Sequence, residues 1–413
     1  MSKAAAEVVQ YTTTEKSAIG SGMLRNIVIL VTAQVAAMAL WFVTTAILSD
    51  MTREVALSKG TSAALSSAVQ GGFVIGALCS AFTGIADRYP PRFVFAICIW
   101  LGALTTALLL VVPVGSLQAI LLRGLTGFCL AGVYPVGMKI AVGWSKKHRG
   151  LLVGLLVGGL TLGSAAPHLL AWFGGADWRI TIVIASLLAT SAGVLILFTE
   201  NGPLHATASE FNLRTVSYAW TNRKVRRAYA GYLGHMWELY VMWAWIGLAL
   251  SVSFSQQIDS DAAQELAKLV TFFVIAVGAV SCAVAGRVAD VIGKAELTII
   301  AMTISGSSAL FFAIFFGGPL WLMILIAIIW GISVIPDSAQ FSALVADYAP
   351  AEIAGSLMTL QTALGFALTT VTVQLAPALA DKIGWPWLMA LLAFGPLFGI
   401  YSMWGLQRGQ PTA

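Results

Sequence analysis

Four ionisable side chains, Arg123, His235, Glu238 and Asp337, lie within long apolar stretches of this sequence. A charged group inside a lipid bilayer is costly, so it normally serves function or has a fixed partner. Glu238 lies about ten residues into its stretch, and at about 1.5 Å per helical residue this is near the middle of a membrane. Glu238 is therefore the first candidate for a group that binds and releases a proton.

His235 precedes Glu238 by three residues, which places both side chains on one face of a helix. Imidazole titrates near neutral pH in water, so the two groups together can share or relay a proton. A structural alternative stays open. Glu238 can be a permanent partner of Arg123, and His235 can be a packing residue whose hydrogen bonds are satisfied.

Asp337 directly follows Pro336, and proline interrupts a helix by removing one hydrogen bond and crowding the preceding turn. Local unwinding there can expose Asp337 to a cavity, where the carboxylate could bind a solute, carry a second proton or form an inner gate. The alternative is a carboxylate near a helix end that is hydrated from the cytoplasm.

Arg123 has two candidate roles. It can pair with an anionic solute, or it can repel a proton from a nearby carboxylate. It cannot carry the proton itself, because a guanidinium group in a protein keeps its proton. His168 is a weaker candidate, since it lies only a few residues from the end of its apolar stretch.

Aromatic and amide side chains accompany the four ionisable groups. The aromatic candidates are Trp41 and Tyr134, together with a cluster around Glu238 that consists of Tyr232, Trp237, Tyr240, Trp243 and Trp245. The amide candidates are Gln34, Gln70 and Gln340. Aromatic walls with a few polar anchors are typical of a site for a small organic solute. We expect no metal and no cofactor, because no metal-ligand spacing and no nucleotide-binding glycine loop occur in the sequence.

The elements that must position these groups are transmembrane helices. Apolar residues make up 59% of the chain, charged residues 10%, and the mean hydropathy is +0.87. A soluble protein has about 25% charged residues. The apolar stretches are about 20 residues long, twice the length that strands of a membrane β-barrel require. The sequence thus predicts an all-α membrane protein.

We predict twelve spans, arranged as two six-helix halves. Their approximate ranges are 27–49, 62–84, 92–112, 117–143, 150–172, 179–198, 229–254, 266–285, 295–316, 319–345, 354–378 and 386–405. The longest polar stretch separates the sixth span from the seventh. It divides the chain into an N-terminal half, 1–199, a cytoplasmic linker, 200–228, and a C-terminal half, 229–413.

Lys and Arg residues predict the orientation, because loops that stay in the cytoplasm are enriched in them. A cytoplasmic N-terminus places most of the 23 Lys and Arg residues on the inner side. Arg123 lies within a span, and the residues at the predicted outer end are Arg53, Lys59, Arg179, Lys268 and Lys382. An even number of spans puts both termini in the cytoplasm, and we expect a bacterial inner (plasma) membrane.

Three landmarks recur in the two halves at a step of roughly 200 residues, as expected for an internal duplication around a central site. The polar hairpin T-G-I-A-D-R-Y-P-P-R, which contains Asp87, returns as G-R-V-A-D-V-I-G-K-A, which contains Asp290. Pro135 in the fourth span corresponds to Pro336 in the tenth. Trp178 and Trp385 open the sixth and the twelfth spans.

With these features the sequence resembles the major facilitator superfamily over all twelve spans. The first hairpin matches the family signature G-x-L-A-D-R-x-G-R-K at Ala86, Asp87, Arg88 and Arg92, and R-G-L-T-G from Arg123 matches the R-x-x-x-G signature of the fourth span. The resemblance implies two pseudo-symmetric halves around a cavity lined by spans one, four, seven and ten. It also implies that the arginine of the fourth span serves proton coupling.

The resemblance further implies a conformational latch at the inner end. In the family, the aspartate of the first hairpin meets the cytoplasmic start of the eleventh helix, here residues 351–356, and steadies the outward-open state. A carboxylate is favoured at the positive N-terminal end of a helix. The latch residues are accordingly Asp87, Arg88, Arg92 and, from the second copy, Asp290.

The leading functional prediction is a secondary active transporter that works by alternating access. We expect proton-coupled symport of a small carboxylated metabolite into the cell, with Arg123 for the anion and Glu238 for the proton. The fifth span lacks the Gly-Pro pair of the family's antiporter signature, which favours uptake. An alternative is proton-coupled efflux of lipophilic or cationic compounds, with Glu238 and Asp337 as the negative sites.

A reading of another class is a transporter-like membrane sensor, which would normally carry a larger cytoplasmic domain than this linker and these tails provide. We do not expect an enzyme, because the sequence contains no cluster of catalytic residues. The expected partners are a small-molecule solute, protons and the lipid bilayer. Nucleic acid is not expected, and the protein is predicted to be a monomer.

Overall fold

The computed structural model describes residues 22–145, 149–175, 177–203 and 216–407, and it leaves out the side chains of residues 86, 87, 149, 216, 351 and 352. Within these ranges the chain is helical and contains no strand. Of the described helical segments, 11 are long and apolar enough to cross a membrane, and a shorter apolar helix, Gly22–Met38, precedes them. The predicted all-α membrane fold is confirmed.

The described helices of the first half are Gly22–Met38, α2 (Val43–Ala46), α3 (Leu48–Glu54), α4 (Lys59–Thr83), α5 (Ile85–Arg88), α6 (Pro91–Ala107), η1 (Leu108–Leu110), α7 (Leu117–Leu130), α8 (Tyr134–Val142), α9 (Arg149–Gly174) and α10 (Trp178–Ile196). Those that follow are α11 (Val216–Thr221), α12 (Arg223–Phe254), α13 (Ser260–Ile292), α14 (Lys294–Ile314), α15 (Leu320–Ser333), α16 (Ser338–Tyr348), α17 (Ala351–Ile383), α18 (Trp385–Leu392) and α19 (Phe394–Gln407).

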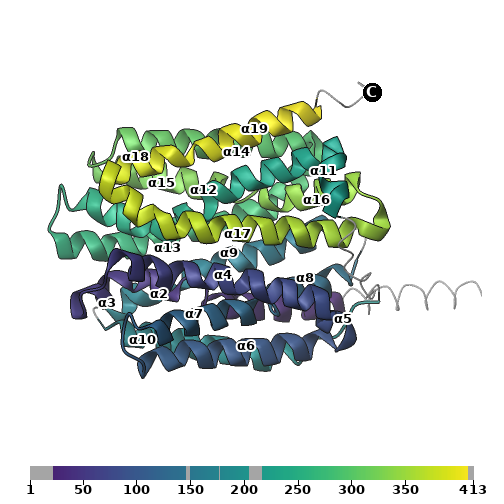
Figure 1. Cartoon of the computed structure of the whole chain (residues 1–413), viewed down its shortest axis with the longest axis horizontal. Coiled ribbons are helices and arrows are strands. Elements are labelled where there is room, and N and C mark those ends of the chain that lie inside the picture. The colour runs from purple at the N-terminus through teal and green to yellow at the C-terminus, as the bar shows by residue number, and fades with distance from the viewer. Residues whose placement is uncertain (1–21, 146–148, 176, 204–215, 408–413) are drawn as a thin grey trace, which may run out of the picture.

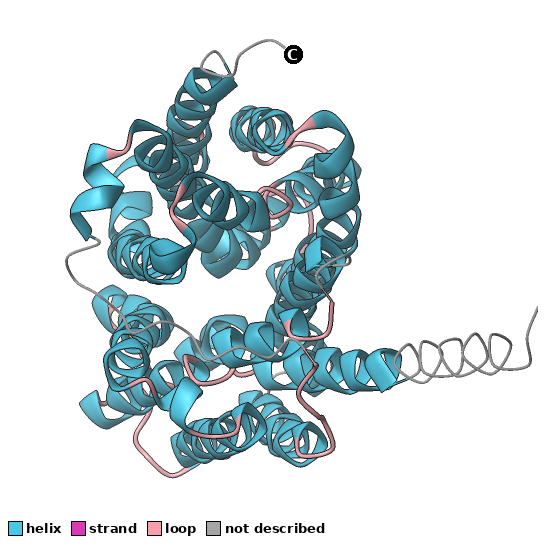
Figure 2. Cartoon of the chain, turned by 90° about the vertical axis from the view of Figure 1, so that its right-hand side faces the viewer, coloured by secondary structure: helices cyan, strands magenta, loops and turns pink. Residues whose placement is uncertain are grey.

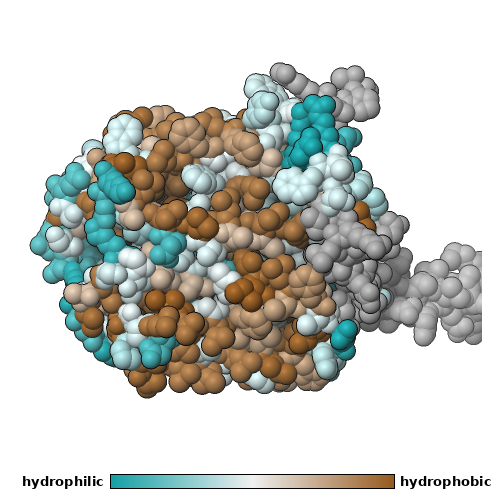
Figure 3. Space-filling model, viewed as in Figure 1, coloured by the Kyte–Doolittle hydropathy of each residue, from teal (hydrophilic) through white to brown (hydrophobic). Residues whose placement is uncertain are grey.

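The helices form two groups that lie side by side. The helices up to α10 occupy the lower part of Figure 1 and those from α11 onward the upper part, and Figure 2 shows both groups nearly end-on. The groups meet where α9 packs against α13 and α4 against α17. Apolar residues cover most of the side of the molecule in Figure 3, and hydrophilic residues gather at its ends. This distribution suits a helix bundle that spans a bilayer.

Glycines allow α9 and α13 to approach closely across the boundary between the halves. A Cβ atom at Gly154 would lie 3.0 Å from the carbonyl oxygen of Cys282, and one at Gly158 would lie 2.9 Å from that of Ala279. Lipid gives no hydrophobic drive for helices to associate, so close backbone packing at small residues does this work.

Prolines mark helix breaks at equivalent places in the two halves. The fourth span is divided into α7 and α8 just before Pro135, and the tenth into α15 and α16 at Pro336. The first span is broken as well, between Met38 and α2, where the prediction had one continuous helix. The seventh span begins earlier than predicted, because α12 starts at Arg223 and Asn222 caps it by accepting from the backbone N–H groups of Lys224 and Val225.

Candidate functional site

The break in the tenth span positions Asp337, the residue that immediately precedes α16. Its Oδ1 atom lies 2.9 Å from Nδ1 of His235 on α12. Both side chains are almost fully buried, with 1% and 2% of their surface exposed for His235 and Asp337 respectively. His235 Nε2 has no hydrogen-bond partner among the described residues. The same holds for Asp337 Oδ1, because its contact with the imidazole lacks hydrogen-bond geometry. The pair thus joins two helices by a close contact and leaves an atom of each side chain without a hydrogen bond.

Aromatic rings enclose this pair. The ring centroid of His235 lies 5.8 Å from that of Phe341 and 6.1 Å from that of Tyr232. Tyr232 stacks on the imidazole, one turn away on the same helix. These rings fix the orientation of the imidazole and exclude water from its faces, which strengthens its interaction with Asp337.

Glu238 has different partners from those the sequence suggested. Trp330 of α15 donates its indole N–H to Oε1 at 2.8 Å, and Ser305 of α14 donates its hydroxyl to Oε2 at 2.9 Å. Both carboxylate oxygens therefore accept hydrogen bonds from within the C-terminal half. The alternative in which Arg123 is the permanent partner of Glu238 is wrong, because Arg123 donates instead to backbone carbonyl groups of the first span.

Arg123 is buried on α7 and reaches the break in the first span. Its Nη2 atom donates to the carbonyl oxygens of Leu40 and Trp41, at 3.0 and 2.7 Å. These carbonyls lie where the helix is interrupted, so a helical N–H group no longer satisfies them. Nε and Nη1 of Arg123 have no hydrogen-bond partner among the described residues. Arg123 thus secures the broken first span and retains unpaired donors.

Gln34 faces the interior from the first helix. Both atoms of its amide are buried, and neither has a hydrogen-bond partner in the described part of the chain. A Cβ atom at Gly137 on α8 would lie 2.7 Å from Gln34 Oε1, and one at Gly159 on α9 would lie 3.5 Å from its Cγ atom. Glycine at these two positions leaves room for the amide. Tyr134 precedes Gly137 by three residues, at the start of α8, and is half-buried.

Gln361 is a candidate that the sequence analysis missed. It is fully buried on α17, its Oε1 atom accepts from Ser342 at 3.4 Å, and its Nε2 atom has no partner among the described residues. The rule that selected Gln34, an amide inside an apolar stretch, would have found it. Gln340 is buried on α16, and His168 is buried on α9 with Nε2 unpartnered in the described structure.

Four of these residues lie at one depth. Gln34, His235, Asp337 and Gln361 are each roughly 10–12 residues from the helix end on the predicted cytoplasmic side, about 15–18 Å along the helix. We call them the polar layer. They come from both halves, and each carries a buried polar atom that has no hydrogen-bond partner among the described residues. Such atoms are rare in folded proteins and indicate a place for a ligand, an ion or water.

An aromatic cluster lies beyond the polar layer toward the predicted outer end. Trp41 packs against Phe73, Tyr240 and Phe366, with ring centroids 5.1, 6.0 and 5.5 Å away. Phe73 and Phe366 belong to α4 and α17, and their centroids are 4.5 Å apart. The cluster therefore joins the two halves at this depth.

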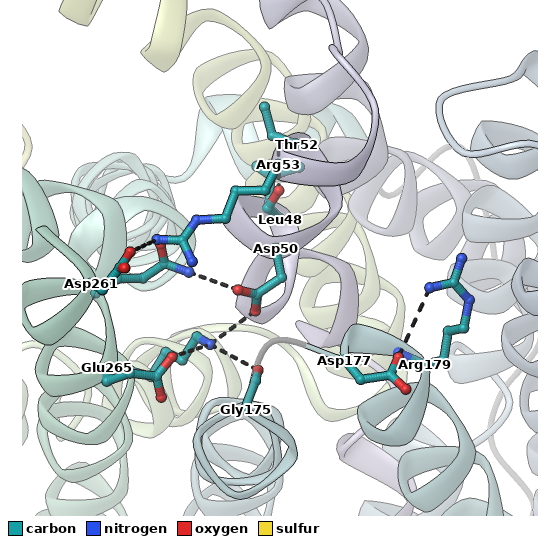
Figure 4. A network of polar contacts seen from close by, with 11 residues as sticks. Leu48, Asp50, Thr52, Arg53, Gly175, Asp177, Arg179, Asp261 and Glu265 are labelled. Atoms are coloured by element: carbon teal, nitrogen blue, oxygen red, sulfur yellow. Dashed lines mark hydrogen bonds and ion pairs between the residues drawn. The ribbon is translucent and has the colours of Figure 1, made fainter.

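Charged residues join the two halves at the predicted outer end itself (Figure 4). Asp50 of α3 accepts from Gln264 at 2.7 Å and pairs with Lys268 at 2.9 Å, both on α13. Two more ion pairs between the halves, Arg53–Asp261 and Lys59–Asp381, are exposed. The molecule is therefore closed at this end.

Glu54 makes an exposed contact within the first half at the same end. It accepts from Arg179 at 2.6 and 2.9 Å and from the indole N–H of Trp178 at 2.8 Å. These hydrogen bonds, that of Arg179 first, lower the pKa of Glu54 to about 2.

The proposed inner latch is described only in part. The side chain of Asp87 lies outside the described residues, as do those of Ala351 and Glu352, so its contact with the eleventh span stays a prediction. Arg92 donates to the carbonyl oxygen of Thr199 at 3.3 Å, which joins the third and sixth spans of one half. Arg88 and Asp290 are exposed.

Known proteins share this architecture. The sequence matches the model of the Major Facilitator Superfamily over residues 30–360. No curated protein matches it significantly. A crystal structure of a mutant of the nucleoside transporter NupG is similar, with a TM-score of 0.69 and 15% sequence identity, over 92% of this chain and 99% of that chain. At this identity the likeness shows the fold. The family match indicates a membrane transporter and not an enzyme, and we conclude that the chain belongs to the major facilitator superfamily.

Proposed function

We propose that the protein takes up a small organic solute by alternating access and couples this uptake to proton movement, with His235 and Asp337 as the proton-binding pair. The observation that carries the proposal is their buried contact of 2.9 Å at a helix break, with His235 Nε2 unpartnered among the described residues. A buried pair of titratable groups on two separate helices can change its contact when it gains a proton. Glu238, the first candidate from the sequence, is less suited, because both of its oxygens already accept hydrogen bonds.

The polar layer supports an uncharged solute with several hydrogen-bonding groups. Gln34 and Gln361 offer amide donors and acceptors, and His235 offers a ring nitrogen. Aromatic rings beside these polar groups suit a ligand that has both apolar and polar parts. The nucleoside transporter NupG has the same fold, and a nucleoside is a solute of this kind.

A carboxylated metabolite is the second candidate, and Arg123 supports it. The guanidinium group is buried with Nε and Nη1 unpartnered among the described residues, and arginine donors of this kind suit a carboxylate. Efflux of cationic compounds has less support, since each oxygen of Glu238 already accepts a hydrogen bond from the protein.

Flux measurements on purified protein in liposomes test the proposal. An inward proton gradient is imposed, and entry of radiolabelled nucleosides, sugars and monocarboxylates is compared with entry when an ionophore has removed the gradient. We expect gradient-dependent entry of an uncharged solute. Entry of monocarboxylates alone would favour the second candidate, and entry that ignores the gradient would refute proton coupling.

A further inference from the structure

Lys268 has a buried ammonium group whose partners lie on both halves. Its Nζ atom lies 2.9 Å from Asp50 Oδ2, 2.8 Å from Glu265 Oε1 and 3.3 Å from the carbonyl oxygen of Gly175. The ammonium group donates hydrogen bonds to the Gly175 carbonyl and to Glu265, and its contact with Asp50 is an ion pair without hydrogen-bond geometry. Asp50 and Gly175 belong to the first half, at the ends of the first and fifth spans, and Glu265 belongs to α13 itself (Figure 4).

Asp50 is matched to α13 in the same way. One carboxylate oxygen accepts from Gln264 and the other pairs with Lys268, four residues further along that helix. Only 1% of the Asp50 side chain and 5% of the Lys268 side chain is exposed. The three side chains of Asp50, Gln264 and Lys268, together with the carbonyl group of Gly175, are here called the outer lock.

Burial distinguishes the outer lock from its neighbours. In Arg53–Asp261 the two side chains are 48% and 79% exposed, and in Lys59–Asp381 they are 67% and 42% exposed. Exposed ion pairs contribute little, because water solvates the separated charges almost as well as the pair. A buried charge that loses its partner is strongly unfavourable.

The same burial makes the outer lock reversible. When the two halves separate at this end, water reaches Asp50 and Lys268 and solvates both charges. The closed and the open arrangement therefore both satisfy the charged groups, whereas a closed arrangement that lacks one partner does not. We infer that Lys268 is the residue on which closure of this end depends during transport, and that it does so by bridging Asp50 and the Gly175 carbonyl across the two halves.

This inference requires alternating access but no particular solute, so it can be tested without one. Spin labels are placed at Ala56 and Ala262, two exposed positions on opposite halves at this end, in a cysteine-free background in nanodiscs. Double electron–electron resonance then gives the distribution of distances between the labels. We expect one short distance in the parent protein, and in Lys268→Met at least a tenfold rise in the ratio of long to short distances.

Two further variants make the test specific. Asp50→Asn keeps the side-chain shape and the contact with Gln264, so we expect the same direction with a smaller change. Lys59→Met removes an exposed ion pair at the same end and should change the ratio less than twofold. If Lys268→Met is too unstable to measure, Asp50→Asn gives the decisive result.

The results separate the outer lock from the proposed transport function. Unchanged distances in both Lys268→Met and Asp50→Asn would overturn the outer lock, and so would an equal shift in Lys59→Met. A shift in the lock variants together with no proton-driven solute flux in the parent protein would leave the outer lock standing and refute the proposed function alone.

Discussion

Glu238 and Asp337 are two buried carboxylates of the same half, yet their surroundings differ. Glu238 accepts one hydrogen bond on each oxygen, from Trp330 and Ser305, and both donors belong to its own half. Asp337 lies at a helix break and contacts His235, whose second nitrogen is unpartnered among the described residues. A satisfied carboxylate holds helices together, whereas an incompletely satisfied pair has capacity for a proton or a solute. The difference underlies our proposal that Glu238 serves structure and Asp337 serves transport.

The largest effect is expected for Asp337→Asn. The amide has nearly the same shape but cannot bind and release a proton, so proton-driven uptake should fall by about 100-fold, the lower end of the range for a positioned acid–base group. Counterflow of solute in the absence of a gradient should persist. The measurement compares both fluxes in liposomes, with Asp259→Asn, an exposed carboxylate of the same half, as the matched control. Full proton-driven uptake by Asp337→Asn would show that Asp337 does not carry the proton.

His235→Gln should have the next largest effect. Glutamine can contact Asp337 but cannot bind and release a proton, so we expect roughly tenfold slower proton-driven uptake and a flatter pH profile. Uptake is measured from pH 5.5 to 8. A profile that keeps its shape at a lower rate would show that His235 only packs.

Glu238→Gln tests the structural role of Glu238. The new amide NH₂ group would face either the Trp330 N–H group or the Ser305 hydroxyl, from which the carboxylate now accepts a hydrogen bond. Two donors would then oppose each other, so the free energy of unfolding should fall by about 1–3 kcal/mol. Uptake should stay within about threefold of the parent protein and keep its pH dependence. Thermal unfolding and uptake are measured on the same preparation. Loss of the pH dependence with unchanged stability would return the proton-carrier role to Glu238.

Glu54 is a carboxylate exposed to water, and its replacement should have the smallest effect. Its pKa is lowered to about 2, so its stabilising contribution is complete above its ordinary value of 4.5 and is lost as the pH falls through about 2. Glu54→Gln should lower the melting temperature at pH 7 by roughly 1–2 °C, as for other exposed ion pairs, and this difference should shrink between pH 4.5 and pH 3. A large decrease at pH 7, or one that grows on acidification, would contradict this role.

Much of the fold follows from the sequence. Long apolar stretches must become helices, because each satisfies its own backbone hydrogen bonds in lipid. Proline predicted the break beside Asp337, and charge inside apolar stretches selected His235 and Asp337 before their contact was known. The sequence also selected Arg123, but its contact with the carbonyls of Leu40 and Trp41 depends on a break in the first span that no proline marks.

The tertiary structure decided the partners. His235 and Glu238 share one helix face, yet one contacts Asp337 and the other contacts Trp330 and Ser305, because three helices meet that face. Helices that are apolar all round carry little information about their rotation, so the sequence does not fix which neighbour a polar side chain meets. Asp50 and Lys268 are far apart in the chain and read as loop charges by themselves. Only the packing of α3 against α13 buries them together, and burial changes a weak surface ion pair into a contact on which the closed state depends.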